Sequence, residues 1–102
     1  MQMSNFNVVV SPAAQTDFLS IVDHLNMLPP EETSQILDLL IEEVNTLQTE
    51  PKSCPFARDS QLRIRRYRVL AVDNYIFFFL IIGSTVEIRR ILYTKRQYER
   101  FL

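Results

Sequence analysis

Residues 62–93, LRIRRYRVLAVDNYIFFFLIIGSTVEIRRILY, decide the fold of this chain. Apolar and polar residues alternate on either side of an unbroken apolar run at Tyr75–Ile82. Such a run is typical of a central strand that is covered on both faces. Asp73-Asn74 and Gly83-Ser84 stand where two-residue hairpin turns belong. The stretch therefore predicts an antiparallel meander with strands at Leu62–Val72, Tyr75–Ile82 and Val86–Leu92.

The last strand of the meander has a break in its alternation. Val86 and Ile88 keep a period of two, whereas Ile91 departs from it. One extra residue in a strand produces such a shift, so we predict a β-bulge near Arg89-Arg90. A short helix is expected to follow over Lys95–Leu102.

The N-terminal half predicts one strand and two helices. Asn5–Val10 ends in three valines, which is typical of a strand. Ser11-Pro12 combines a good N-cap acceptor with a proline that suits the first helical position, and Pro29-Pro30 ends the helix that begins there. A second helix is expected from there to Pro51, antiparallel to the first and joined to it by the short Pro-Pro turn as a helical hairpin. The apolar stripes at helical spacing are Ala14, Phe18, Ile21, Val22, Leu25 and Leu28 in the first helix, and Thr33, Ile36, Leu37, Leu40, Val44 and Leu47 in the second.

These elements together predict an α+β fold. It consists of an N-terminal strand, a helical hairpin, a three-stranded antiparallel meander and a short C-terminal helix, in one layer of sheet and one of helices. Residues 52–61 are expected to be a loop. The helices cover one face of the sheet, and we expect the other face to be open and to carry the function.

Length and composition exclude several classes of site. The chain has 102 residues, 12.0 kDa, one glycine, one cysteine and one histidine. We expect a single domain over residues 1–102, with no glycine-rich phosphate loop, no disulfide framework, no metal site and no cofactor. The longest apolar run has only eight residues and no secretory leader is recognisable, so a cytoplasmic protein without a membrane segment is expected.

The charge is divided unevenly along the chain. Residues 1–51 hold eight acidic residues and no lysine or arginine, whereas residues 52–102 hold all eleven basic residues and four acids, giving −8 and +7. One interpretation is a surface for an anionic partner on the second half. Another, equally open from charge alone, is that the two halves neutralise each other within the fold.

Arginines and tyrosines are interleaved in the second half. Arg66 and Arg68, two apart on the predicted strand, are expected on one face. Arginine binds phosphate bidentately and aromatic rings stack on unpaired bases, so the cluster suits RNA binding or metal-independent cleavage of a phosphate ester. The alternative is an edge-strand charge row that prevents aggregation, with tyrosines in the core. The further members are Arg89, Arg90, Lys95 and Arg96, with Tyr67, Tyr75, Tyr93 and Tyr98.

Several segments together resemble the RelE/ParE superfamily of bacterial type II toxins. The strand-to-helix start at residues 9–18, the end of the second helix at residues 44–51 and the C-terminal pattern carry the resemblance, which covers nearly the whole chain. The C-terminal pattern is Arg68 through Asn74-Tyr75, then VEIRRILY at 86–93 and RQYE at 96–99.

The resemblance implies a growth-inhibiting toxin held inactive by an antitoxin encoded nearby. Many relatives cleave mRNA on the ribosome, and the leading hypothesis is such an endoribonuclease, using attack by the ribose 2′-hydroxyl. The catalytic candidates implied by position are Arg68, Arg90, Tyr93, Arg96 and Tyr98, and the RNA-binding candidates are Arg63, Arg65, Arg66 and Lys95.

Two alternatives stay open within the same resemblance. Ribosome-dependent nucleases of the superfamily often carry an arginine just after the aromatic residue of the central strand, where this chain has Ile76, and a histidine where it has Tyr93. These differences favour a ParE-like inhibitor of DNA gyrase, or an inactive relative that binds only an antitoxin. We expect a helix or an extended segment of the antitoxin to cover the open sheet face and its apolar edges, and free toxin to pair with itself through that surface.

Overall fold

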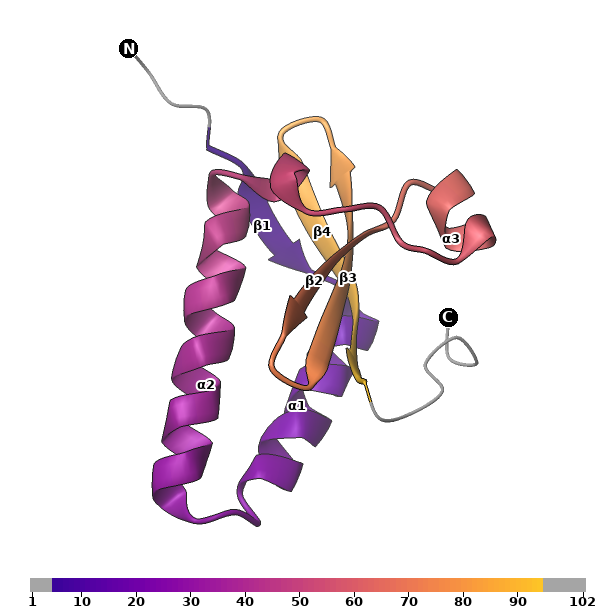
Figure 1. Cartoon of the computed structure of the whole chain (residues 1–102). Helices are drawn as coiled ribbons and strands as arrows, with labels where there is room; N and C mark the ends of the chain where they lie inside the picture. The colour runs from indigo at the N-terminus through magenta and orange to yellow at the C-terminus, as the bar shows by residue number, and fades with distance from the viewer. Residues whose placement is uncertain (1–4, 95–102) are drawn as a thin grey trace.

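The computed structural model describes residues 5–94 and confirms the predicted α+β class (Figure 1). Two long helices lie beside a four-stranded sheet, and a short third helix projects from the far side of that sheet. In chain order the elements are β1 (Asn7–Val10), α1 (Pro12–Leu25), α2 (Pro30–Asn45), 3-10 turns at Thr46–Gln48 and Pro51–Ser53, α3 (Ser60–Ile64), β2 (Arg68–Val72), β3 (Tyr75–Ile82) and β4 (Thr85–Tyr93).

The sheet has the order β1-β4-β3-β2, with β1 parallel to β4 and the other pairs antiparallel. Asp73 and Gly83 adopt positive φ values of 54° and 60° in the two turns of the meander, as their residue types favour. The predicted bulge is present: Phe78 pairs with Arg90 and Phe79 with Ile88, so Arg89 is the extra residue. The bulge restores Ile91 to the face that Ile88 occupies.

The signals at the helix starts act as predicted, whereas both helices end earlier than expected: α1 ends at Leu25, before Pro29, and α2 at Asn45, before Pro51. The Ser11 hydroxyl accepts a hydrogen bond of 3.2 Å from the amide of Ala14, and Pro12 follows as the first helical residue. In α2, Pro30 is the first helical residue and Glu31 lies in the first turn, where its charge complements the helix dipole. The helix ends at Asn45 and a 3-10 turn continues towards Pro51.

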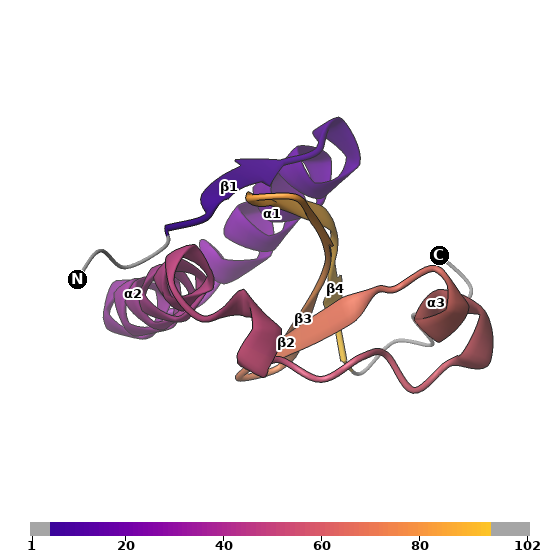
Figure 2. The ribbon, with the colours of Figure 1, turned by 90° about the horizontal axis from the view of Figure 1, so that it is seen from above.

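The main core lies between the helices and one face of the sheet (Figure 2). Phe77 and Phe79 of β3 point into it and are 3% and 0% exposed. The helices contribute Leu25 and Leu40, also almost fully buried. This face of the sheet is covered by the helical hairpin, as predicted.

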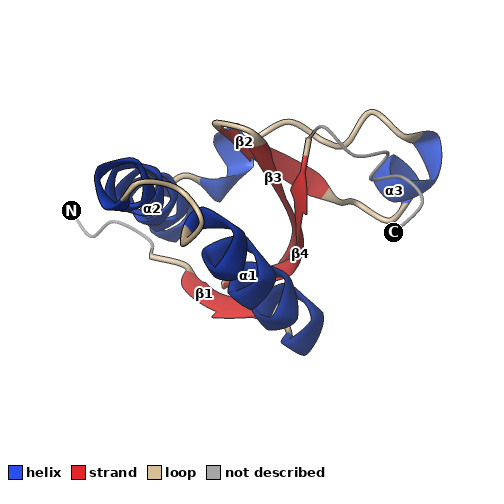
Figure 3. Ribbon diagram, turned by 90° about the horizontal axis from the view of Figure 1, so that it is seen from below, coloured by secondary structure: helices blue, strands red, loops and turns tan. Residues whose placement is uncertain are grey.

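The opposite face of the sheet is not open, contrary to the sequence prediction. Residues 57–67, which we call the arginine lobe, fold over it and bury Ala57 and Leu62 against Phe78 and Leu92 (Figure 3). The lobe is closed at its base by a hydrogen bond of 2.9 Å from the Ala57 amide to the Tyr67 carbonyl. Residues of β3 therefore pack against the helices on one face and against the arginine lobe on the other, which explains why the whole strand is apolar.

The prediction of a strand over Leu62–Val72 is wrong in its first half. The Asp59 carboxylate accepts hydrogen bonds from the amides of Gln61 (2.9 Å) and Leu62 (3.1 Å), and so caps the N-terminus of α3. Arg63 thus lies on a helix and Arg65 at its C-cap, while Arg66 has a φ of 70°. None of these three lies on β2, so Arg66 does not share a strand face with Arg68.

The predicted C-terminal helix over Lys95–Leu102 lies outside the described residues. Within residues 5–94, no helix has the length and apolar character needed to cross a membrane.

Candidate functional site

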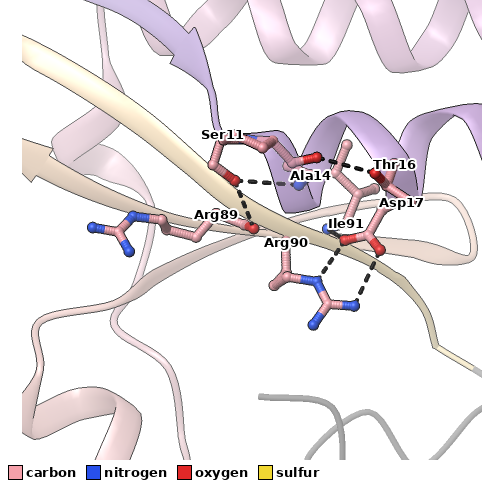
Figure 4. A network of polar contacts seen from close by, with 8 residues as sticks. Ser11, Ala14, Thr16, Asp17, Arg89, Arg90 and Ile91 are labelled. Atoms are coloured by element: carbon pink, nitrogen blue, oxygen red, sulfur yellow. Dashed lines mark hydrogen bonds and ion pairs between the residues drawn. The ribbon is translucent and has the colours of Figure 1, made fainter.

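Arg90, a predicted catalytic residue, is held by a carboxylate on α1 (Figure 4). Asp17 accepts hydrogen bonds from Arg90 Nε at 2.7 Å and Nη2 at 3.1 Å, and from the Ile91 amide at 3.0 Å. The Ser11 hydroxyl donates to the carbonyl of Arg89 at 3.0 Å. Beyond the end of β1, the side chains of Ser11 and Asp17 are therefore hydrogen-bond partners of the β4 backbone. The hydrogen bond to Asp17 raises the pKa of the Arg90 guanidinium above its usual value.

Arg68, the other arginine on the sheet that was predicted to be catalytic, is also engaged within the fold. Its Nη1 donates to the carbonyls of Cys54 (2.6 Å) and Lys52 (3.2 Å), and its guanidinium lies 4.0 Å from the ring centroid of Phe56. Arg68 thereby fastens residues 52–56 beside β2. Burial raises the pKa of the nearby Cys54 thiol above its usual value, which disfavours the nucleophilic thiolate.

The sheet register separates these two arginines. Arg68 pairs with Phe79 and Arg90 pairs with Phe78. Phe79 points into the core under the helices, whereas Phe78 packs under the arginine lobe. Since directly paired residues share a face, Arg68 and Arg90 do not converge on one substrate position.

Tyr93 belongs to an aromatic group at the end of β4. Its ring centroid lies 5.4 Å from that of Tyr75 and 6.2 Å from that of the exposed His24. Burial, with smaller contributions from Tyr93 and Asp73, raises the pKa of the Tyr75 hydroxyl above its usual value. A raised pKa keeps the Tyr75 hydroxyl protonated at neutral pH, so little of the phenolate that could accept a proton is present. The remaining candidates Lys95, Arg96 and Tyr98 lie outside the described residues.

The arginine lobe presents four exposed arginines, including three predicted RNA-binding residues. Arg58, Arg63, Arg65 and Arg66 make no hydrogen bond or ion pair through their side chains within residues 5–94. Ile64, which is 79% exposed, stands among them. Unlike Arg68 and Arg90, these arginines are available to a ligand.

Arg66 occupies a position that favours glycine. The amides of Arg66 and Tyr67 donate to the carbonyls of Arg63 (2.9 Å) and Leu62 (3.0 Å), the pattern of a Schellman cap, and Arg66 itself takes the left-handed conformation. A side chain at such a φ is disfavoured relative to glycine.

We therefore expect Arg66→Gly to stabilise the folded protein by about 0.5–1 kcal/mol. Urea denaturation followed by circular dichroism measures the change. Arg65→Gly is the matched control, because Arg65 has a φ of −78° and gains nothing from glycine. A lower unfolding midpoint for Arg66→Gly than for the unmodified chain would contradict the expectation.

A separate apolar groove of about 580 Å³ lies between α1, α2 and the sheet. Leu19 on α1 and Ile41 on α2 border it and are 65% and 55% exposed. Large apolar side chains that remain this exposed beside a groove are typical of a protein-binding surface. The groove is lined by Val10, Gln15, Phe18, Leu19, Leu40, Ile41, Val44, Asn45, Phe77, Ile88 and Ile91.

Sequence analysis missed the structural role of Asp17 and the groove. Nothing in the spacing links Asp17 to Arg90, because the contact depends on how α1 crosses β4. The sequence did contain a signal for the groove. Leu19 and Ile41 are large apolar residues that lie outside the predicted stripes, so they make the apolar face of each helix wider than its core contacts require. Among residues 5–94, no group of three or more histidine, cysteine, aspartate or glutamate side chains is placed to hold a metal ion.

The chain is similar to known proteins in sequence and in fold. Residues 8–98 match the family described as "ParE toxin of type II toxin-antitoxin system, parDE". A chain of the solved structure "Chromosomal ParDE TA system from P. aeruginosa" superimposes with a TM-score of 0.71 at 20% sequence identity, covering 88% of this chain and 97% of that chain. A search of curated proteins finds no significant match.

The structural likeness shows that the fold is shared. The family match spans most of the chain and confirms the predicted membership of the RelE/ParE superfamily. The chain belongs to the ParE toxin family of type II toxin–antitoxin systems.

Proposed function

We propose that this toxin inhibits DNA gyrase by binding it and does not cleave mRNA. The observation that carries the proposal is the engagement of Arg68 and Arg90 within the fold, on opposite faces of the sheet. Cleavage of a phosphate ester needs groups that converge within hydrogen-bond reach of one reacting phosphate. To serve there, Arg90 would have to leave a carboxylate that it contacts with two nitrogen atoms.

The experiment combines a supercoiling assay with transcript mapping. Purified toxin is added to gyrase and relaxed plasmid, and mRNA 5′ ends are mapped in cells after toxin induction. We expect loss of supercoiling and intact transcripts. Unimpaired supercoiling together with new 5′ ends inside translated codons would instead establish the ribosome-dependent nuclease, and no growth arrest would indicate a relative that only binds the antitoxin.

Membership of a ParDE system implies a cognate antitoxin as partner. We propose that the antitoxin fills the apolar groove between α1 and α2 with the apolar face of a helix. The exposed Leu19 and Ile41 on opposite sides of the groove would both be buried by such a helix. When no antitoxin is present, a second copy of the toxin would cover the same surface.

A further inference from the structure

We propose that the arginine lobe binds the phosphate backbone of double-stranded DNA. The inference rests on the proposed function, because gyrase holds duplex DNA while it works. It assigns the lobe a direct contact with that DNA in addition to the toxin's contacts with the enzyme.

The first support is an excess of positive charge in the lobe. Four arginines fall within residues 58–66, and the only acid there is Asp59. The Asp59 carboxylate is engaged as the helix cap of α3, accepting from two backbone amides. Within the described part of the chain, no other acidic side chain pairs with these arginines. Their mutual repulsion is relieved when a ligand supplies several negative charges.

The second support is the residue type at position 66. The Schellman cap favours glycine there, yet the sequence has arginine in the left-handed conformation. Residues held in disfavoured backbone conformations concentrate at functional sites. All four basic residues of the lobe are arginines, whose planar guanidinium groups match phosphate oxygens bidentately.

The third support is the separation of opposite charges across the molecule. The lobe and α2 lie on opposite sides of the sheet (Figures 2 and 3). The exposed surface of α2 carries Glu31, Glu32, Asp38 and Glu42. A polyanion would therefore be attracted to the lobe and repelled by the helical side, which orients the toxin on DNA.

Duplex DNA fits the lobe better than an acidic peptide. It presents about one negative charge per 1.7 Å of axis, so a compact group of four arginines can meet several phosphates at once. Contacts of this kind need no base recognition, because phosphate oxygens are present at every position of the backbone.

The experiment measures binding of the purified toxin to a fluorescent random-sequence DNA duplex between roughly 50 and 200 mM salt. Four phosphate contacts predict a slope of log K against log salt of about −3 to −4. We expect the combined replacement of Arg58, Arg63, Arg65 and Arg66 by glutamine to bring the slope near zero and to weaken binding at least about tenfold at low salt.

Single replacements separate a local contact from net charge. Arg63→Gln is expected to reduce the magnitude of the slope by about 1, and Lys52→Gln, which removes the same charge outside the lobe, to leave it unchanged. Arg66→Gly is a second test that does not risk unfolding, because it is expected to gain stability and still lose one contact. Circular dichroism verifies that every variant is folded.

Three outcomes would overturn the proposal. The first is unmodified toxin that binds duplex DNA with no salt-dependent slope, and the second is a fourfold variant that binds as well as the unmodified toxin; gyrase inhibition, measured separately, would then still stand. The third is a fourfold variant that fails to inhibit gyrase although the unmodified toxin does not bind duplex DNA, which would assign the lobe to an acidic protein surface.

Discussion

Asp17→Ala is expected to destabilise the folded toxin by about 3 kcal/mol, which is more than a hundredfold in the folding equilibrium. The carboxylate accepts two hydrogen bonds from Arg90 and one from the Ile91 amide, and its side chain is only 14% exposed. Its removal leaves the guanidinium and the β4 edge without this acceptor. For a domain of this size the melting temperature should fall by roughly 12–24 °C.

Thermal and urea denaturation of Asp17→Ala, Arg90→Met and the double variant measure this effect. The double-mutant cycle should give a coupling energy of about 1–3 kcal/mol. Asp23→Ala is the matched control, since Asp23 is an exposed acid on the same helix and its loss should change stability by less than about 0.5 kcal/mol. If Asp17→Ala behaved like Asp23→Ala, the contact with Arg90 would be no more than an ordinary surface ion pair.

Leu19→Arg or Ile41→Arg is expected to weaken antitoxin binding at least about a hundredfold, or roughly 3 kcal/mol. Both side chains border the groove and are largely exposed in the free toxin. In the complex, the new guanidinium would be buried against the apolar face of the antitoxin helix without a partner. Because neither side chain is buried in the free toxin, its stability should change by less than about 0.5 kcal/mol.

Calorimetric titration of toxin with antitoxin measures the affinity, and induction beside the antitoxin tests rescue of growth. Met27→Arg is the control, because Met27 is 83% exposed, equally apolar and not part of the groove lining. We expect it to be neutralised normally. Full neutralisation of both Leu19→Arg and Ile41→Arg would place the antitoxin elsewhere on the toxin. The same two variants should remain monomeric if free toxin pairs through this surface.

Local sequence signals predicted most of the sheet. The unbroken apolar run at Tyr75–Ile82 gave the limits of the central strand, and the parity change at Ile91 gave the bulge. Such features depend on neighbouring residues within one strand, so they can be read from the sequence. The five-residue helix α3 was missed because its apolar contribution is essentially Leu62, too little for a periodic pattern. Asp59, its N-cap residue, was the signal that was available.

The candidate site was less predictable for a different reason. Arg68 and Arg90 have the same residue type as the four lobe arginines, and composition cannot tell an arginine that fastens the fold from one that is free for a ligand. The difference depends on contacts with Cys54 and Asp17, which are far away in the sequence. An anionic partner was expected for the second half of the chain, and residues 58–66, where the arginines remain exposed, are the part of it that such a partner can reach.

The parallel pairing of the first strand with the last constrains when the toxin can become active during its synthesis. The Ser11 hydroxyl meets the carbonyl of Arg89, 78 positions later, so β1 stays unpaired until β4 has left the ribosome. Contacts this distant in sequence slow folding towards milliseconds to seconds. The apolar groove proposed for the antitoxin needs Ile88 and Ile91 of β4 in its lining and forms only when β4 has joined the sheet. An antitoxin that binds in this groove, as proposed, would therefore bind after β4 has joined the sheet and not while the earlier elements are being synthesised.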